Sequence, residues 1–106
     1  MFAVISIPRL EQMLDQGQDL VMIDLRSPEE YGAGHLAGAV NIPEEELCRD
    51  RLMPYAGRVL VFYCTHGGKS MRAARDWGKR GFHAASLGSG IQYYRGKYGP
   101  VSQNPH

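Results

Sequence analysis

One stretch of seven residues combines a cysteine, two glycines and a lysine, and it reads Cys64, Thr65, His66, Gly67, Gly68, Lys69 and Ser70. It follows the apolar run 59–63, which is typical of a buried strand. A cysteine between a strand end and a helix start is exposed to the positive end of the helix dipole, and a nearby lysine adds a full charge. Both favour the thiolate, which is the nucleophilic form. Two glycines allow the backbone to curl round the sulfur with its N–H groups pointing inward. We therefore predict a catalytic Cys64 with residues 65–70 as its substrate-binding loop.

The end of this stretch, GKS, also occurs in phosphate-binding loops of nucleotide-binding proteins. That motif requires a glycine five positions before its second glycine, Gly68. The residue there is Tyr63, which cannot make the tight turn. The nucleotide-binding hypothesis is therefore rejected.

Cysteine-based phosphatase chemistry is a second possibility for the same residues. Such enzymes need five residues between the cysteine and an arginine, whose planar fork binds phosphate oxygens. Here that position is Ser70, the cation one step earlier is Lys69, and Tyr63 precedes the cysteine where those enzymes carry histidine. The shorter loop suits a smaller group, such as one sulfur atom. Phosphatase or arsenate-reductase chemistry stays as an alternative. A cysteine that only packs as a small apolar residue is disfavoured, because it would need neither the glycines nor the lysine.

Strands and helices alternate around this stretch. The apolar patterns predict strands at 4–6, 20–25, 39–40, 59–63 and 84–87, and helices at 8–16, from 28, at 44–52, 70–80 and 91–97. This order predicts an α/β fold with a mostly parallel central sheet of about five strands and helices on both faces. In such sheets ligands bind at the carboxyl ends of the strands, where Cys64 is placed.

Composition limits the classes of function. A chain of 106 residues with a net charge of +1 is expected to form one domain without a field that attracts nucleic acid. No membrane span or signal peptide is predicted, so a cytoplasmic location is expected. Two cysteines are no disulfide framework, and the four histidines lack metal-ligand spacing, so no metal is expected. We assign residues 1–98 to the domain and 99–106 to a frayed tail.

Several motifs resemble those of small single-domain members of the rhodanese (thiosulfate sulfurtransferase) superfamily. The cysteine stretch matches that family's loop of Cys, two residues, Gly, one residue, Arg or Lys, and often Ser. The upstream signature is matched by DLR at 24–26, SPEEY at 27–31 and GHLAGAVNIP at 34–43. Ala73–Ala74, Gly81–Phe82 and the closing run 87–94 are also similar, although Ser89 and Tyr94 replace the usual Gly and Trp. The resemblance covers about residues 4–98.

The resemblance implies a two-step transfer of sulfur through a Cys64 persulfide. The implied partners are a sulfur-containing anion such as thiosulfate as donor, and cyanide, a thiol or a protein dithiol as acceptor, without metal or organic cofactor. It also implies that Asp24 and Arg26 form an ion pair that supports the loop. Lys69 in place of the commoner Arg keeps the charge and loses the bidentate fork. A non-enzymatic persulfide relay or docking module remains an alternative.

Other residues with possible roles receive simpler interpretations. His35 resembles the structural histidine of the family, and His66 is expected to be exposed and to select substrates. Cys48 is predicted to be a bystander within the helix 44–52. Trp77 is expected in the core beside Met71 and Ala74, and the tyrosines at 93, 94 and 98 are expected to pack the last helix.

Overall fold

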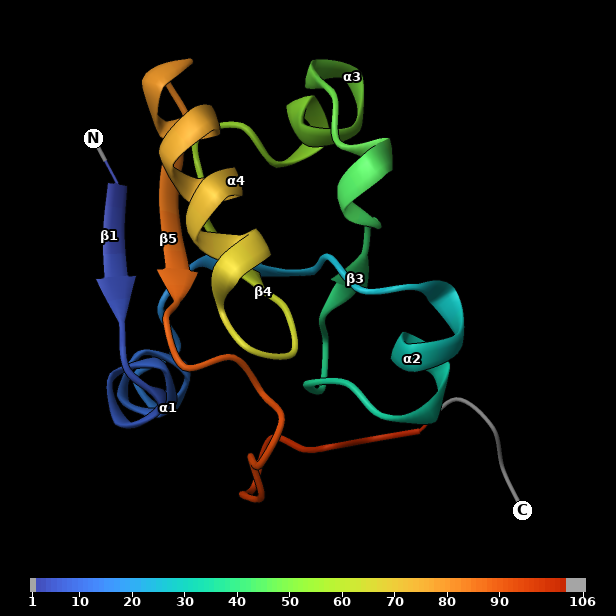
Figure 1. Cartoon of the computed structure of the whole chain (residues 1–106). Helices are drawn as coiled ribbons and strands as arrows, with labels where there is room; N and C mark the ends of the chain where they lie inside the picture. Colours follow the sequence, from blue (N-terminus) through green and yellow to red (C-terminus); the bar gives the residue numbers. More distant parts are fainter. Residues whose placement is uncertain (1, 103–106) are drawn as a thin grey trace.

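The computed structural model describes residues 2–102, which form one twisted sheet with helices on both of its faces (Figure 1). The strands are β1 (Phe2–Ile5), β2 (Leu20–Asp24), β3 (Val40–Asn41), β4 (Val59–Tyr63) and β5 (His83–Leu87). All pairs are parallel, in the spatial order β1-β5-β4-β2-β3. The predicted fold class is confirmed.

The helices are α1 (Ile7–Asp15), α2 (Pro28–Ala33), α3 (Arg49–Leu52) and α4 (Gly68–Lys79), with 3-10 turns at Glu44–Glu46 and Met53–Tyr55. Local signals account for two of their starts. Ser6 caps α1 by accepting the Arg9 N–H, and Ser27 forms the predicted capping box of α2 with Glu30. Each of these helices has a proline in its first turn, where the missing N–H costs nothing.

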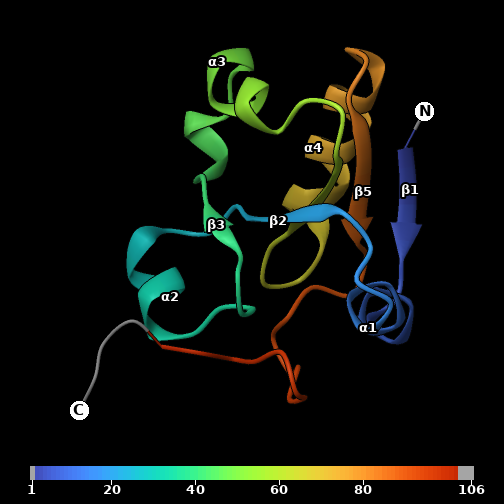
Figure 2. The same ribbon diagram turned by 180° about the vertical axis from the view of Figure 1, so that it is seen from behind.

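Two apolar clusters pack on opposite faces of the sheet, because successive strand residues point to opposite sides. Leu10 and Met13 of α1 pack in the cluster that contains Val61 and Tyr63 of β4. Leu52 of α3 and residues 73–74 of α4 pack in the other cluster, with Leu60 and Phe62. In Figure 1 α4 lies in front of the sheet, and in the reverse view of Figure 2 it lies behind.

Three predicted helices need correction. The helix at 44–52 is divided into a 3-10 turn and the short α3, so that Cys48 is an exposed N-cap and not a helical residue. The helix expected from Ser70 begins at Gly68, which leaves four residues, 64–67, between β4 and α4. On α4 Ala74 is buried and Trp77 half-buried against Phe82, but Met71 is exposed, contrary to the prediction.

The helix expected at 91–97 is absent, and turns take its place. We call residues 88–102 the closing segment. Its side chains are bound to α1: Tyr94 donates a 2.7 Å hydrogen bond to Glu11, and Lys97 lies 2.7 Å from Asp15. These tertiary contacts outweigh the weak helical preference of a short segment that contains Gly96. Tyr94 packs as predicted, whereas Tyr93 is 85% exposed.

The described part of the predicted tail is held in place. Val101 and His35 exchange backbone hydrogen bonds of 2.8 and 2.9 Å, which connect this part of the chain to the residues after α2. Residues 103–106 of that predicted tail lie outside the described chain. Within residues 2–102, no helix combines the length and apolar character that a membrane crossing requires.

Candidate active site around Cys64

Cys64 follows β4 directly, at the carboxyl edge of the sheet to which the strand arrows in Figure 1 point. Residues 64–67, which we call the cysteine loop, connect β4 to α4. The Cys64 side chain is buried, and its Sγ accepts a 3.0 Å hydrogen bond from the Gly67 N–H. The first turn of the 12-residue α4 begins immediately after Gly67 and places its positive end at the sulfur. The predicted inward-pointing backbone is therefore represented by one direct N–H contact and by the helix end.

The two glycines of the loop differ in their roles. Gly67 has φ +104°, and a Cβ there would lie 2.0 Å from the Gly88 oxygen. Gly68 is the first residue of α4 and has no left-handed φ, and a Cβ added there would meet only Arg72 Nη1, at 4.0 Å. The prediction that both glycines supply unusual backbone angles is right for Gly67 and wrong for Gly68.

The closing segment fixes the position of the cysteine loop from the other side. The Ile91 N–H donates to the Cys64 carbonyl at 3.1 Å, and the Gln92 N–H to the Thr65 carbonyl at 3.2 Å. At Gly90, a Cβ would lie 2.1 Å from the Thr65 oxygen. Ser89, which stands in place of a usual glycine, has a negative φ and is exposed, so the turn accommodates it.

Ser70 lies behind the sulfur. Its Oγ is 3.7 Å from Cys64 Sγ and 3.0 Å from the Gly67 carbonyl, to which it donates. It also shares a 2.8 Å hydrogen bond with Ser86 of β5, and both serines are fully buried. The sequence indicated Ser70 but not Ser86, because a serine inside a strand carries no signal until its neighbours are known.

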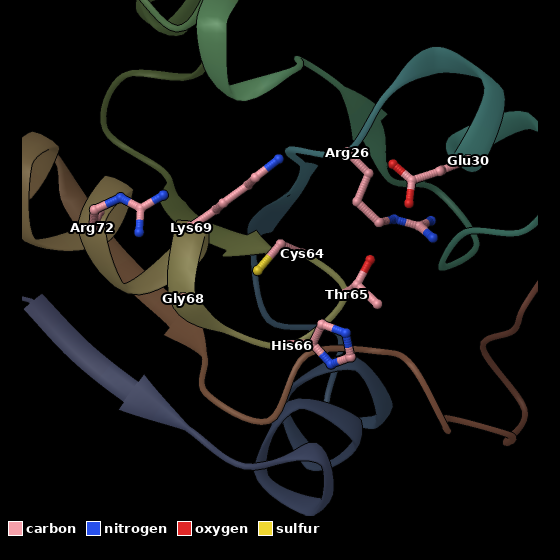
Figure 3. Close-up of a pocket in the computed structure, with 8 residues that line it drawn as sticks. All are labelled: Arg26, Glu30, Cys64, Thr65, His66, Gly68, Lys69 and Arg72. Atoms are coloured by element: carbon pink, nitrogen blue, oxygen red, sulfur yellow. The ribbon is translucent and has the colours of Figure 1, made fainter.

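The sulfur lies beside a hollow of about 470 Å³, which we call the first hollow. Figure 3 shows Lys69 and Arg72 of α4 on one side of Cys64, and Arg26 with Glu30 on the other. Its lining residues are Arg26, Glu30, Cys64, Thr65, His66, Gly68, Lys69 and Arg72. Among the predicted loop residues, Ser70 is buried behind the sulfur and Gly67 is buried beneath it, whereas His66 is exposed as expected.

Two lining residues were missed in the sequence. Arg72 lies three residues after Lys69 on α4, so helical spacing places both cations on the same side, and this signal could have been used. Arg72 also contacts Glu44 at 3.2 Å. Glu30 was recognised only as a capping residue, and its approach to Cys64 depends on how α2 packs.

Asp24 and Arg26 form the predicted ion pair. Arg26 Nη2 lies 2.8 Å from Asp24 Oδ2, Nε bonds the other carboxylate oxygen at 3.1 Å, and the Arg26 N–H donates to it at 2.8 Å. Asn41 Nδ2 donates to the carbonyls of both residues at 3.0 Å. Burial lowers the pKa of Arg26, but hydrogen bonding and the charge of Asp24 outweigh it and raise the pKa overall. Arg26 is therefore a fixed cation at the border of the hollow.

Hydrogen bonds, burial and nearby charges also fix the charge states of Glu30 and Tyr63. The Ser27 N–H bond to the Glu30 carboxylate is the main cause that lowers the pKa of Glu30, and the charges of Arg26 and Lys69 act in the same direction. Burial, followed by the charge of Asp24, raises the pKa of Tyr63, whose oxygen accepts the Leu36 N–H. His35 is buried, hydrogen-bonded to the Tyr31 carbonyl and stacked on that ring, which agrees with its predicted structural role.

Within the described chain, His, Cys, Asp and Glu side chains do not gather in groups of three that could hold a metal ion. The chemistry available here is that of a thiol with hydrogen-bond donors around it, at the floor of a cationic hollow. A small anion can enter, and the sulfur can form a covalent bond with it.

Comparison with known proteins agrees with this arrangement. A model of the rhodanese-like domain family matches residues 6–97. The chain is 39% identical over 94 residues to a tRNA sulfurtransferase of Desulfurococcus amylolyticus, covering 85% of this chain and 18% of that protein. It is 31% identical over 81 residues to the thiosulfate sulfurtransferase GlpE of Shewanella oneidensis, covering 76% and 79% of the two chains.

The fold is similar to that of a rhodanese-like domain protein from Staphylococcus aureus, with a TM-score of 0.79, 20% identity and coverage of 90% and 93% of the two chains. The chain spans less than a third of the length of some curated relatives that it matches. The match to the family model nevertheless includes β2, the cysteine loop and most of the closing segment. The chain therefore belongs to the rhodanese-like domain family.

Proposed function

We propose that this protein transfers sulfane sulfur from thiosulfate, or from another anionic donor, to a thiophilic acceptor through a persulfide on Cys64. The observation that carries the proposal is the Cys64 Sγ at the floor of a cationic hollow, with the Gly67 N–H 3.0 Å away. Relatives described as thiosulfate and tRNA sulfurtransferases support the same class of reaction. The reduced Cys64 that this chemistry needs suits a reducing compartment, so the cytoplasm is the proposed location.

In the first step, the Cys64 thiolate attacks the outer sulfur of thiosulfate. The S–S bond of thiosulfate breaks, sulfite leaves with the electron pair, and Cys64 retains the sulfur as an anionic persulfide. In the second step, the acceptor nucleophile attacks that outer sulfur and Cys64 leaves as a thiolate. Lys69, Arg72 and Arg26 attract the dianion, and the Gly67 N–H stabilises negative charge on the sulfur.

Phosphoryl or arsenate chemistry is less well supported. The position at which a cysteine phosphatase carries its arginine is Ser70, which is fully buried and bonded to Ser86. An arginine fork there would have to replace the buried serine pair. A passive docking module would not require a cationic hollow around a cysteine. A persulfide relay that takes its sulfur from a protein donor remains compatible with the same site.

Intact mass spectrometry tests the proposal. Thiosulfate is expected to add about 32 Da to the protein, and cyanide to remove it. The cyanide step is essential because oxidation to a sulfinic acid adds nearly the same mass but is not reversed by cyanide. Cys64→Ala should never gain this mass, whereas Cys48→Ala, at the exposed cysteine, should behave as the unchanged protein. A cyanide-sensitive gain that persists in Cys64→Ala would refute the mechanism.

A further inference from the structure

A second hollow of about 300 Å³ adjoins the first, and the two share Arg26, Glu30 and Thr65 as lining residues. In Figures 1 and 2 the closing segment, drawn in orange to red, runs past the cysteine loop from α1 towards α2. The second hollow's other lining residues are Ala33, Gly34, Ile91, Gln92, Arg95 and Pro100. A ligand that reaches Cys64 can therefore extend past Arg26 onto the closing segment.

The combined space is larger than the reaction of thiosulfate and cyanide requires. Thiosulfate has five atoms and cyanide two, whereas the first hollow alone has a volume of about 470 Å³. Hollows of this size are typical of sites for larger organic ligands. One of the two substrates is therefore expected to be a larger molecule, part of which the second hollow could hold.

Arg95 is the cation of the second hollow that no described carboxylate neutralises. Its Nη1 donates to the Tyr94 carbonyl at 2.7 Å, and within residues 2–102 it has no acidic partner. The two other charged lining residues are already engaged: Arg26 binds Asp24 and the Gly34 carbonyl, and Glu30 caps α2. A guanidinium in this position suits a carboxylate, which it can bind with two parallel hydrogen bonds.

The other lining residues of the second hollow could contact a short peptide-like ligand. Ala33, Ile91 and Pro100 provide apolar surface, and Gln92 provides a side-chain amide. Ile91 and Gln92 are also held at a fixed position relative to Cys64, because their N–H groups donate to the carbonyls of Cys64 and Thr65. A site that is preformed in this way loses little entropy when it binds an extended ligand.

We propose that the second hollow is a subsite for the sulfur acceptor, and that this acceptor is a small peptide-like thiol with a carboxylate that Arg95 binds. This inference rests on the proposed sulfurtransferase function. The acceptor thiolate attacks the outer sulfur of the Cys64 persulfide, the bond between the two sulfurs of the persulfide breaks, and Cys64 leaves as a thiolate. The product is the persulfide of the acceptor, and no oxidant or reductant is consumed.

The test uses protein that is first loaded with thiosulfate and then mixed with glutathione or with glutathione diethyl ester, which has the same thiol but no free carboxylate. Glutathione is expected to be the better acceptor for the unchanged protein. Arg95→Gln should lower kcat/KM for glutathione relative to the ester about tenfold, as expected for the loss of one charge-assisted contact. Arg75→Gln, at an exposed arginine of α4 that pairs with Asp76, is the matched control and should leave the ratio unchanged.

A second variant tests the hollow without changing any charge. Ala33 is exposed at the end of α2, and Ala33→Phe should fill the hollow and lower kcat/KM for glutathione relative to cyanide. Equal use of glutathione and its ester by the unchanged protein, or a ratio that Arg95→Gln does not alter, would overturn the subsite. A protein that gains no cyanide-sensitive 32 Da mass would instead refute the proposed function, so the two failures are distinguishable.

Discussion

Ser70 Oγ lies 2.8 Å from Ser86 Oγ in the fully buried space behind Cys64, and 3.7 Å from the sulfur on its other side. The Gly67 carbonyl, to which Ser70 donates, also accepts the Met71 N–H at 3.0 Å. The Ser70 hydroxyl can therefore turn from that carbonyl to a thiolate without leaving a buried acceptor unpaired. Ser86 can then donate to Ser70 and hold it in this orientation. Together the two serines form a donor that responds to the charge of the sulfur.

This pair predicts a change in the reactivity of Cys64 when Ser86 is replaced. In Ser86→Ala, Ser70 loses the partner that orients it, and the rate of Cys64 alkylation by iodoacetamide at neutral pH should fall. Ser70→Ala should lower this rate more, about tenfold, because a hydrogen bond to a charged group is lost. Ser89→Ala, at an exposed serine of the closing segment, is the control. A change in stability without any change in the alkylation rate would limit Ser86 to a packing role.

The two loop glycines should respond differently to alanine. Gly67→Ala places a Cβ against the Gly88 oxygen at a left-handed φ, and should reduce the free energy of unfolding by about 3 kcal/mol and abolish transfer. Gly68→Ala introduces a better helix former at the first residue of α4 and should raise stability by up to about 1 kcal/mol. Urea unfolding of both variants measures the difference, and equal losses would show that Gly68 also needs its glycine.

Charges around the first hollow should change the KM for thiosulfate in opposite directions. Lys69 has no ion-pair partner within the described chain, so Lys69→Gln should raise KM about fivefold at low salt. Glu30→Gln should lower KM, because it removes a negative charge while glutamine can still complete the capping box.

Both effects should shrink in about 1 M salt, where charges are screened over roughly 3 Å. Steady-state assays at two ionic strengths measure them. Salt-independent changes of the same size would point to altered geometry instead of charge.

The ion pair at the border of the first hollow should matter far more than an exposed one. Arg26→Ala leaves the fully buried Asp24 carboxylate without its cation, and we expect a loss of about 3 kcal/mol in the free energy of unfolding. Arg51→Ala removes a pair whose side chains are 45% and 50% exposed, and should cost less than about 1 kcal/mol. A double-mutant cycle with Asp24→Asn measures the coupling, and additive losses would mean that the two side chains act separately.

The attachment of the closing segment to α1 should depend on pH. Hydrogen bonds from Lys97 and then from Tyr98 lower the pKa of Asp15 below its ordinary value of 3.8. A lowered pKa means that this contribution is fully present above about pH 5 and is lost as the pH falls through the folded-state pKa. The Ala37 amide, which donates to the Tyr98 carbonyl at 2.7 Å, reports the loss as a reduced hydrogen-exchange protection factor in acid.

Asp15→Asn should lower that protection at neutral pH and remove its acid dependence between pH 5 and pH 3. Asp50→Asn, at an exposed carboxylate of α3, should leave it unchanged. If the Ala37 amide of Asp15→Asn remains fully protected, the closing segment is held by packing of Tyr94 and Ile91 instead.

The sequence by itself determined where the strands lie along the chain and that Cys64 directly follows β4. A continuous apolar run such as 59–63 is a local pattern, and the residue that follows a parallel strand must lie at the carboxyl edge of the sheet. The capping box at Ser27 is likewise contained within four residues, so it could be recognised without tertiary information.

Only the tertiary structure decided which distant groups surround the sulfur. The approach of Gly67 to Gly88, the position of Ser86 behind Ser70, and the placement of Arg95 beside the cysteine loop all join residues on separate elements. The segment 91–97 has a pattern compatible with a helix, yet its bonds to Glu11 and Asp15 hold it in turns. Local preferences amount to tenths of a kcal/mol per residue, and packing against the rest of the fold outweighs them wherever the two conflict.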